Sequence, residues 1–184
     1  MIISKMKEKT SKSELIYKGK ILNLRLDKVI LPNGREAKRE IIEHSGSVAI
    51  LPLIGKDKFL LVQQYRKPVE KVLLEIPAGR IERGENLKEC AKRELMEETG
   101  YQANDFKKLA SVYLAPGYSS EIIHIFLARN LKKSKPNPDE DEFIKTVTLN
   151  KKEVLDKIID NKIKDSKTIV SILLFLYNEA LLDY

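Results

Sequence analysis

The pattern of hydrophobic and polar positions first predicts a β-rich region near the N-terminus. Leucine alternates with polar residues from Leu22 to Leu26, which indicates a strand over residues 22–31 with one apolar face. Pro32-Asn33-Gly34 then predicts a tight turn, because Asn-Gly supplies the positive φ angles that a short hairpin needs. The returning strand is expected over residues 38–44. This hairpin is a candidate for a small, separate sheet.

Further apolar runs predict a second and larger group of elements. The run over residues 48–53 is continuously apolar and favours a more deeply buried strand, and a turn at Gly55 leads to its partner over residues 59–65. Other strands are expected over residues 72–76, 109–113, 122–128 and 143–149. Residues 132–142 are expected to form a polar loop with an acidic run.

Three segments have helical periodicity, over residues 86–99, 151–159 and 167–182. Asn86 is the expected N-cap of the first helix, with Glu89 as its reciprocal partner in a capping box, and Gly100 is placed to end that helix. Ser166 is the expected cap of the last helix.

The order of these elements predicts an α+β fold, because a short β region is followed by mixed strands and helices. A chain of 184 residues has room for one ordinary domain with a small appendage. We therefore divide it into an N-terminal β region, residues 1–45, and a main domain, residues 46–184.

Composition narrows the classes of protein that fit. Hydrophobic residues make up 42% and charged residues 33%, which excludes disordered and low-complexity chains. The single cysteine, Cys90, excludes a disulfide scaffold, and only two histidines, His44 and His124, argue against a zinc site of the His/Cys type. Any metal ion would have to be held by oxygen ligands.

Charge and hydropathy also bear on partners. The net charge of +7 comes from scattered lysines without interleaved aromatic residues, so we expect no nucleic-acid partner. Residues 1–17 lack the apolar core of a signal peptide, and the apolar stretch over residues 169–182 is too short and too interrupted to span a bilayer. The expectation is a cytoplasmic protein without a membrane partner.

The helix over residues 86–99 carries an unusual set of carboxylates. Glu94, Glu97 and Glu98 are spaced i, i+3, i+4 and therefore share one face, which continues the apolar stripe of Leu87, Cys90 and Ala91. Mutual repulsion, desolvation and the helix dipole all make this placement unfavourable.

Two remedies are available for these carboxylates, namely protonation or nearby cations. Arg93 can pair with Glu97 or with Glu85, but one arginine does not neutralise three glutamates. Clustered carboxylate oxygens suit Mg²⁺ or Mn²⁺. The alternative interpretation is a solvated acidic edge of a surface helix.

The spacing around this helix resembles a known motif. Gly79 is followed by five residues and Glu85, then by seven residues and the run from Arg93 to Tyr101, Arg-Glu-Leu-Met-Glu-Glu-Thr-Gly-Tyr. This resembles the Nudix box of the Nudix hydrolases, from which only Tyr101 departs, because an aliphatic residue is usual there. The resemblance implies a Nudix-type α/β/α sandwich that uses divalent metals to hydrolyse nucleoside diphosphates linked to another group.

Segments outside the box resemble one branch of that family, the ADP-ribose pyrophosphatases; they are residues 39–44, 63–66, 74–79 and 115–121. The resemblance implies Mg²⁺-dependent hydrolysis of the pyrophosphate bond of ADP-ribose to AMP and ribose 5-phosphate. It also implies a homodimer that exchanges its N-terminal sheets. Ile21 and Leu22 stand near where relatives have aromatic residues that sandwich the base, so a GDP-sugar or another nucleoside diphosphate sugar stays open as the substrate. A non-catalytic nucleotide sensor on the same fold is a further alternative.

The resemblance also assigns roles to individual residues. The implied metal ligands, for two or three Mg²⁺ ions or substituting Mn²⁺, are the carbonyl of Ala78 and the carboxylates of Glu94, Glu97 and Glu98. The implied structural positions of the box are Gly79, which permits a tight loop, the pair Glu85 and Arg93, and Gly100. Glu140 and Glu142 are candidates for the catalytic base, with the choice between them open. Candidates for substrate binding are Arg39, Arg66, Arg80 and Glu121, since a planar guanidinium suits both phosphate binding and stacking.

Overall fold

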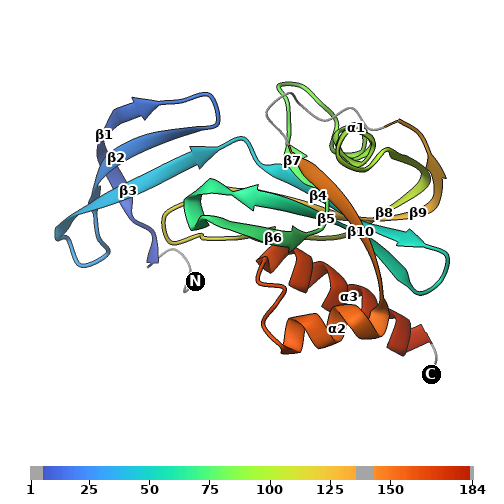
Figure 1. Cartoon of the computed structure of the whole chain (residues 1–184). Coiled ribbons are helices and arrows are strands. Elements are labelled where there is room, and N and C mark those ends of the chain that lie inside the picture. Colours follow the sequence, from blue (N-terminus) through green and yellow to red (C-terminus); the bar gives the residue numbers. More distant parts are fainter. Residues whose placement is uncertain (1–5, 136–142, 183–184) are drawn as a thin grey trace. The chain divides into compact units, whose positions relative to one another are not determined.

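The computed structural model describes residues 6–135 and 143–182, and the chain forms two compact units (Figure 1). The first unit comprises Met1–Gly46 and Tyr113–Ile122, and the second comprises Ser47–Val112 and Ile123–Tyr184. The first unit therefore includes a segment from the middle of the chain.

The first unit is built on a three-stranded antiparallel sheet in the order β1-β2-β3. Its strands are β1 (Lys9–Lys18), β2 (Leu22–Ile30) and β3 (Glu36–His44). The β2–β3 turn contains Gly34 at φ 83°, which is the positive angle expected there. Strand β1 was not expected from the sequence, because all ten of its residues are exposed and show no alternation. Its position is set by pairing with β2.

The second unit contains a seven-stranded mixed sheet with the central order β10-β5-β4-β9-β8. Strand β6 pairs with β5, and β7 pairs with β4. Strands β4 and β9 run parallel, whereas β4 pairs antiparallel with β5 and β7. The strands are β4 (Ser47–Ile54), β5 (Lys58–Arg66), β6 (Lys71–Glu75), β7 (Ala78–Arg80), β8 (Tyr101–Tyr113), β9 (Ile122–Lys133) and β10 (Ile144–Asn150). A short 3₁₀ helix, η2 (Lys67–Val69), joins β5 to β6.

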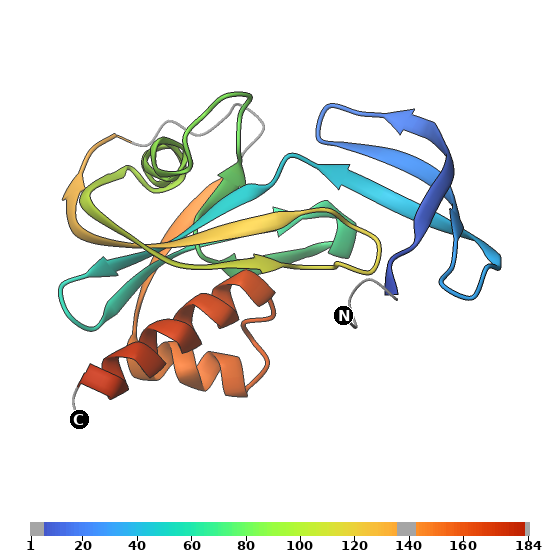
Figure 2. The same cartoon turned by 180° about the vertical axis from the view of Figure 1, so that it is seen from behind.

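Helices cover both faces of this sheet. Helix α1 (Leu87–Thr99) lies on one face, and α2 (Lys151–Ile159) and α3 (Ser166–Leu182) lie on the other (Figures 1 and 2). The sheet has a hydrophobic core on each face. On one face, Val48 and Ile50 of β4 pack with the buried residues of α1, and on the other, Leu51 packs with residues of α2 and α3. Because successive side chains of a strand point to opposite faces, the apolar run of β4 serves two cores. The predicted α+β fold with an α/β/α sandwich and a small antiparallel sheet is confirmed.

The helix ends follow the sequence signals in part. Asn86 accepts a hydrogen bond from the Lys88 amide at 2.8 Å, and Gly100 at φ 69° ends α1, as predicted. The predicted reciprocal bond of a capping box is not part of this cap, because the Glu89 carboxylate instead accepts from Lys92 Nζ at 2.8 Å. The predicted cap of α3 is wrong by one residue, since Asp165 rather than Ser166 accepts from the Thr168 amide, at 3.0 Å.

Within the described part of the chain, no helix is both long and apolar enough to cross a membrane.

Candidate active site

Strand β7 and helix α1 of the second unit bring the predicted box residues together. The Glu94 carboxylate lies against the backbone of Gly79, where a Cβ atom would be 2.0 Å from Glu94 Cδ. Gly79 is not among the glycines with positive φ. The glycine is therefore required by the close approach of a carboxylate, rather than by the tight loop that the resemblance implied.

Arg93 is bonded to three glutamates. Its Nε and Nη2 donate to the Glu85 carboxylate at 2.9 and 3.0 Å, and its Nη1 donates to Glu94 at 2.7 Å and to Glu97 at 2.9 Å. Nη2 also donates to the Arg80 carbonyl at 3.2 Å, which ties the helix to the end of β7. Both pairings considered from the sequence are thus present at once, because a guanidinium presents several donors in a fixed fork.

The glutamates of α1 differ in burial. Glu94 is 8% exposed and Glu98 5% exposed, whereas Glu97 is half-buried. Glu98 Oε2 accepts from the Ala78 amide at 3.3 Å, so this carboxylate lies beside the residue whose carbonyl is the implied metal ligand. The shared face of α1 therefore brings Glu94 and Glu98 to the start of β7.

These residues fit a divalent cation in chemistry. Arg93 is bonded to Glu85, Glu94 and Glu97, and Glu98 lies beside Ala78, so four carboxylates stand against one guanidinium among these described residues. Buried carboxylates need a compensating charge, and their hard oxygens suit Mg²⁺ or Mn²⁺. Among these described residues, however, no three His, Cys, Asp or Glu side chains already converge as a metal site. Arg93 instead holds Glu94 and Glu97.

Cys90 lies beside the arginine but is not suited to nucleophilic chemistry. It is fully buried on the inner face of α1, and burial together with the neighbouring Glu85 raises the pKa of its thiol to about 12. The thiol is therefore protonated at neutral pH, and Cys90 serves as a small core residue.

The Arg93–Glu85 pair predicts a pH dependence of stability. Hydrogen bonding to Arg93 lowers the pKa of Glu85 to about 2 from its ordinary 4.5. A depressed folded-state pKa stabilises the fold above the unfolded value, so this contribution, up to about 3 kcal/mol, should be lost as the pH falls from 4.5 towards 2. Urea unfolding at pH 7 and at pH 3 should show a larger loss for the wild type than for Glu85→Gln. Equal losses would contradict this assignment.

The other predicted residues lie in three places. Arg66, at the end of β5, donates Nε and Nη2 to Glu75 at 2.9 Å each. Arg39 and Glu121 belong to the first unit, where Arg39 is bonded to Glu8 and Glu121 lies 3.7 Å from His44 Nδ1. Glu140 and Glu142 lie outside the described residues. Arg80 is half-buried at the end of β7.

Sequence reasoning assigned no role to a group of buried polar residues near this site. The group consists of Glu75, Asp165, Lys167 and Thr168, of which Glu75, Lys167 and Thr168 are 1%, 7% and 0% exposed. One signal was available, since Glu75 is a charged residue in the apolar run over residues 72–76. The other members come from the start of α3, and no local pattern connects them to β6.

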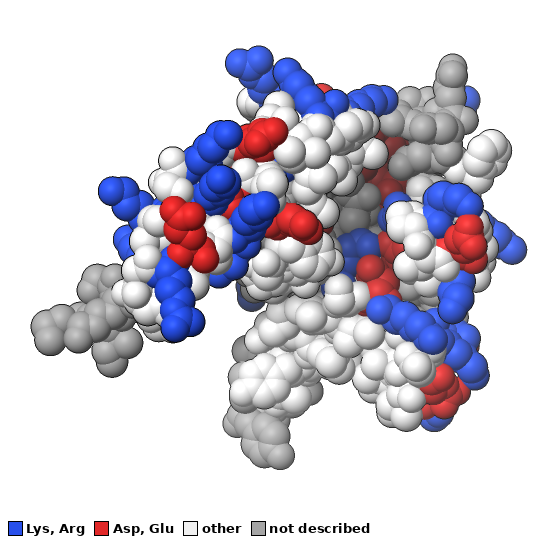
Figure 3. All heavy atoms as spheres, turned by 90° about the vertical axis from the view of Figure 1, so that its left-hand side faces the viewer, with Lys and Arg blue, Asp and Glu red and all other residues white. Residues whose placement is uncertain are grey.

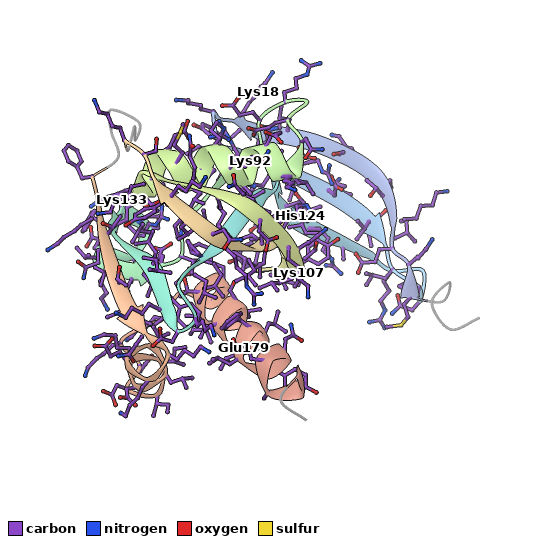
Figure 4. All side chains as sticks on the ribbon, turned by 90° about the vertical axis from the view of Figure 1, so that its right-hand side faces the viewer. Lys18, Lys92, Lys107, His124, Lys133 and Glu179 are labelled. Carbon is purple, nitrogen blue, oxygen red and sulfur yellow. The ribbon has the colours of Figure 1, made fainter. Side chains whose placement is uncertain are left out.

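Charged side chains of both signs lie on the face of the molecule that Figure 3 shows. Figure 3 shows lysine and arginine side chains scattered among acidic and uncharged ones. Lys92 on α1 and Lys107 on β8 are two such exposed side chains (Figure 4).

Comparison with known proteins identifies the class to which this fold and site belong. Residues 43–168 match the NUDIX domain, and residues 8–42 match the nucleoside diphosphate sugar hydrolase N-terminal domain. A solved ADP compounds hydrolase superposes with a TM-score of 0.83 and 25% identity, covering 94% of each chain. The chain therefore belongs to the Nudix family.

Its curated relatives have names that describe several activities. A methanol dehydrogenase activator from Bacillus methanolicus is 43% identical over 95% of both chains. An ADP-ribose pyrophosphatase from Bacillus subtilis is 40% identical over 96% of both chains. A GDP-mannose pyrophosphatase from Yersinia enterocolitica is 36% identical, covering 86% of this chain and 90% of its own. The protein is a Nudix hydrolase, and enzymes of this family use divalent metal ions.

Proposed function

We propose that this chain hydrolyses the pyrophosphate bond of ADP-ribose and releases AMP and ribose 5-phosphate. The observation that carries the proposal is the pair of buried carboxylates, Glu94 beside Gly79 and Glu98 beside Ala78, within a Nudix domain. The choice of ADP-ribose is supported by 40% identity over nearly the whole chain to an ADP-ribose pyrophosphatase.

The proposed roles follow the chemistry of the side chains. Glu94, Glu97, Glu98 and the Ala78 carbonyl would hold Mg²⁺, in two or three ions, with Mn²⁺ as a substitute. Bound there, the metal would offset phosphate charge and acidify a water molecule. Glu140 or Glu142 would accept the proton, and Arg39, Arg66, Arg80 and Glu121 would bind the substrate. Glu85 and Arg93 would fix the loop after β7 to α1, which their hydrogen bonds support.

The test is product analysis. Purified protein incubated with ADP-ribose and Mg²⁺ should release equal amounts of AMP and ribose 5-phosphate, separated by ion-exchange chromatography. Chelation of the metal should abolish the reaction. A protein that releases no AMP under these conditions would refute the proposal.

A second substrate class is favoured by one comparison. The GDP-mannose pyrophosphatase at 36% identity covers most of both chains, so a GDP-sugar is the alternative substrate. The ratio of kcat/KM for ADP-ribose and GDP-mannose decides between them, because that ratio measures discrimination in the transition state. If kcat/KM is higher for GDP-mannose than for ADP-ribose, GDP-mannose is the substrate and the proposal of ADP-ribose is wrong.

A regulatory role is favoured by another comparison. The relative at 43% identity is a methanol dehydrogenase activator, so this chain could activate a dehydrogenase in addition to hydrolysing a nucleotide. Adding the protein to a purified methanol dehydrogenase tests this, and unchanged turnover of the dehydrogenase would dismiss it.

We also propose a cytoplasmic homodimer. Leu15, Ile16 and Tyr17 of β1 and the neighbouring Ile21 are all more than half exposed, and an exposed apolar patch of this kind often marks an interface. The buried free thiol of Cys90 suits a reducing compartment. Sedimentation should give twice the monomer mass, and a monomer at all concentrations would contradict the dimer.

A further inference from the structure

Four charged side chains of the second unit form a largely buried cluster without net charge. The cluster lies where β6 ends and the chain continues to Ala78. Arg66 ends β5, Glu75 ends β6, and Asp165 and Lys167 lie at the start of α3. Glu75 is 1% exposed, whereas Arg66 keeps 36% of its side chain exposed. Two positive and two negative groups balance, which is the condition under which buried charges are tolerated.

The contacts divide Glu75 between two cations. Arg66 donates Nε to Oε1 and Nη2 to Oε2, each at 2.9 Å, in the bidentate geometry that fixes the plane of a guanidinium. Lys167 Nζ also donates to Glu75 Oε2, and it donates to Asp165 Oδ1 at 2.9 Å. Nη1 of Arg66 makes no hydrogen bond within the described residues and keeps its donor capacity.

The same cluster holds the chain that leads to the proposed metal site. The Ile76 amide donates to Thr168 Oγ1 at 2.8 Å, and Thr168 Oγ1 donates to Asp165 at 2.5 Å. The Pro77 carbonyl accepts from the Ile50 amide at 2.8 Å. The next residue is Ala78, whose amide donates to Glu98. Every residue from Glu75 to Ala78 is therefore fixed.

Arg66 also lies within electrostatic range of Glu98. The pKa of Arg66 is raised chiefly by its hydrogen bond with Glu75, and the charge of Glu98 contributes as well. Asp165 is already bonded to Lys167 and Thr168. Glu98 in turn accepts from the Ala78 amide, so Glu75 is the carboxylate whose hydrogen bonds fix the plane of the Arg66 guanidinium.

We propose that Glu75, held in place by Lys167, is a positioning residue that keeps Arg66 directed at a diphosphate oxygen of the substrate. This inference rests on the proposed function, because it assumes that Arg66 binds the substrate. Removal of the Glu75 charge should therefore weaken substrate binding.

The experiment is a double-mutant cycle on KM with Glu75→Gln, Arg66→Ala and the double variant. Glu75→Gln should raise KM roughly tenfold or more, the effect of losing a charge-assisted hydrogen bond, and should change kcat by less than about threefold. If Glu75 acts through Arg66, the double variant should have the KM of Arg66→Ala alone. Effects on KM that multiply would overturn the proposal.

A matched control separates positioning from stability. Lys151 of α2 and Glu179, near the C-terminal end of α3, form another half-buried ion pair that attaches α3. Figure 4 labels Glu179. Lys151→Met should lower the Tm without changing KM. If Glu75→Gln behaves as this control does, Glu75 is structural only and the proposal fails.

Two additions make the outcome decisive. If Glu75→Gln does not fold, Glu75→Asp replaces it in the cycle, because the shorter carboxylate keeps a charge beside Lys167 but loses reach to Arg66. Calorimetric binding of α,β-methylene ADP-ribose is measured in parallel. If the wild type binds this analogue but does not hydrolyse ADP-ribose, the proposed function is refuted. The double-mutant cycle, measured on the Kd of the analogue instead of KM, still tests Glu75. A wild type that does neither refutes both.

Discussion

Glu98→Gln should lower kcat/KM by about 10²–10³-fold, the range seen when one group that stabilises transition-state charge is removed. Glu98 is 5% exposed and accepts from the Ala78 amide, so its charge is well placed to hold a metal ion. The amide has the same shape and can still accept from the Ala78 amide. Without metal, the variant should be as stable as the wild type or more stable, because a buried negative charge has been removed.

Three measurements check this result. Activity is compared at saturating Mg²⁺, and the Tm is compared with and without Mg²⁺, since an ion that binds the folded state raises the Tm. The metal-dependent rise should shrink in Glu98→Gln. Glu89→Gln is the matched control, because Glu89 is an exposed glutamate of the same helix that bonds Lys92. Undiminished activity, or a lower Tm in metal-free buffer, would contradict the role of Glu98.

The parts of the fold that were predictable from sequence are those specified by local signals. Asn86 and Gly100 mark the ends of α1 through a side-chain acceptor and a left-handed backbone. The i, i+4 spacing of Glu94 and Glu98 is enough to place both side chains on one face of α1. Strand β1 was missed because its register depends on pairing with β2, and none of its residues is buried.

The site was predictable only as far as residue types and short spacings determine it. The hydrogen bond from Lys167 to Glu75 joins residues 92 positions apart, and no periodicity encodes such a distance. Glycine is likewise required at position 79 by a tertiary contact and not by turn geometry, because a Cβ atom there would clash with the Glu94 carboxylate. Tertiary contacts therefore supply what the motif leaves open, namely what holds each carboxylate in place.

Gly79→Ala should lower activity about 10²-fold, as loss of a charge-stabilising group does, while costing only about 1–3 kcal/mol of stability. The new Cβ would lie 2.0 Å from the Glu94 carboxyl carbon and 2.1 Å or less from its oxygens. The carboxylate ends a flexible side chain, so it can swing away and relieve most of the clash. The Glu94 carboxylate would then lie outside the site, and its hydrogen bond with Arg93 would be lost.

A second substitution tests this explanation. Glu94→Ala removes the atoms that the new methyl group would meet, so Gly79→Ala should cost little further stability in that background. Gly117→Ala is the control for stability, because a Cβ there meets nothing within 4 Å and the backbone is not left-handed. Urea unfolding gives the stability of the wild type, the three single variants and the Gly79→Ala/Glu94→Ala double variant. If Gly79→Ala destabilises the Glu94→Ala protein as much as the wild type, the constraint lies in the backbone of β7, and the contact with Glu94 is not the reason for glycine.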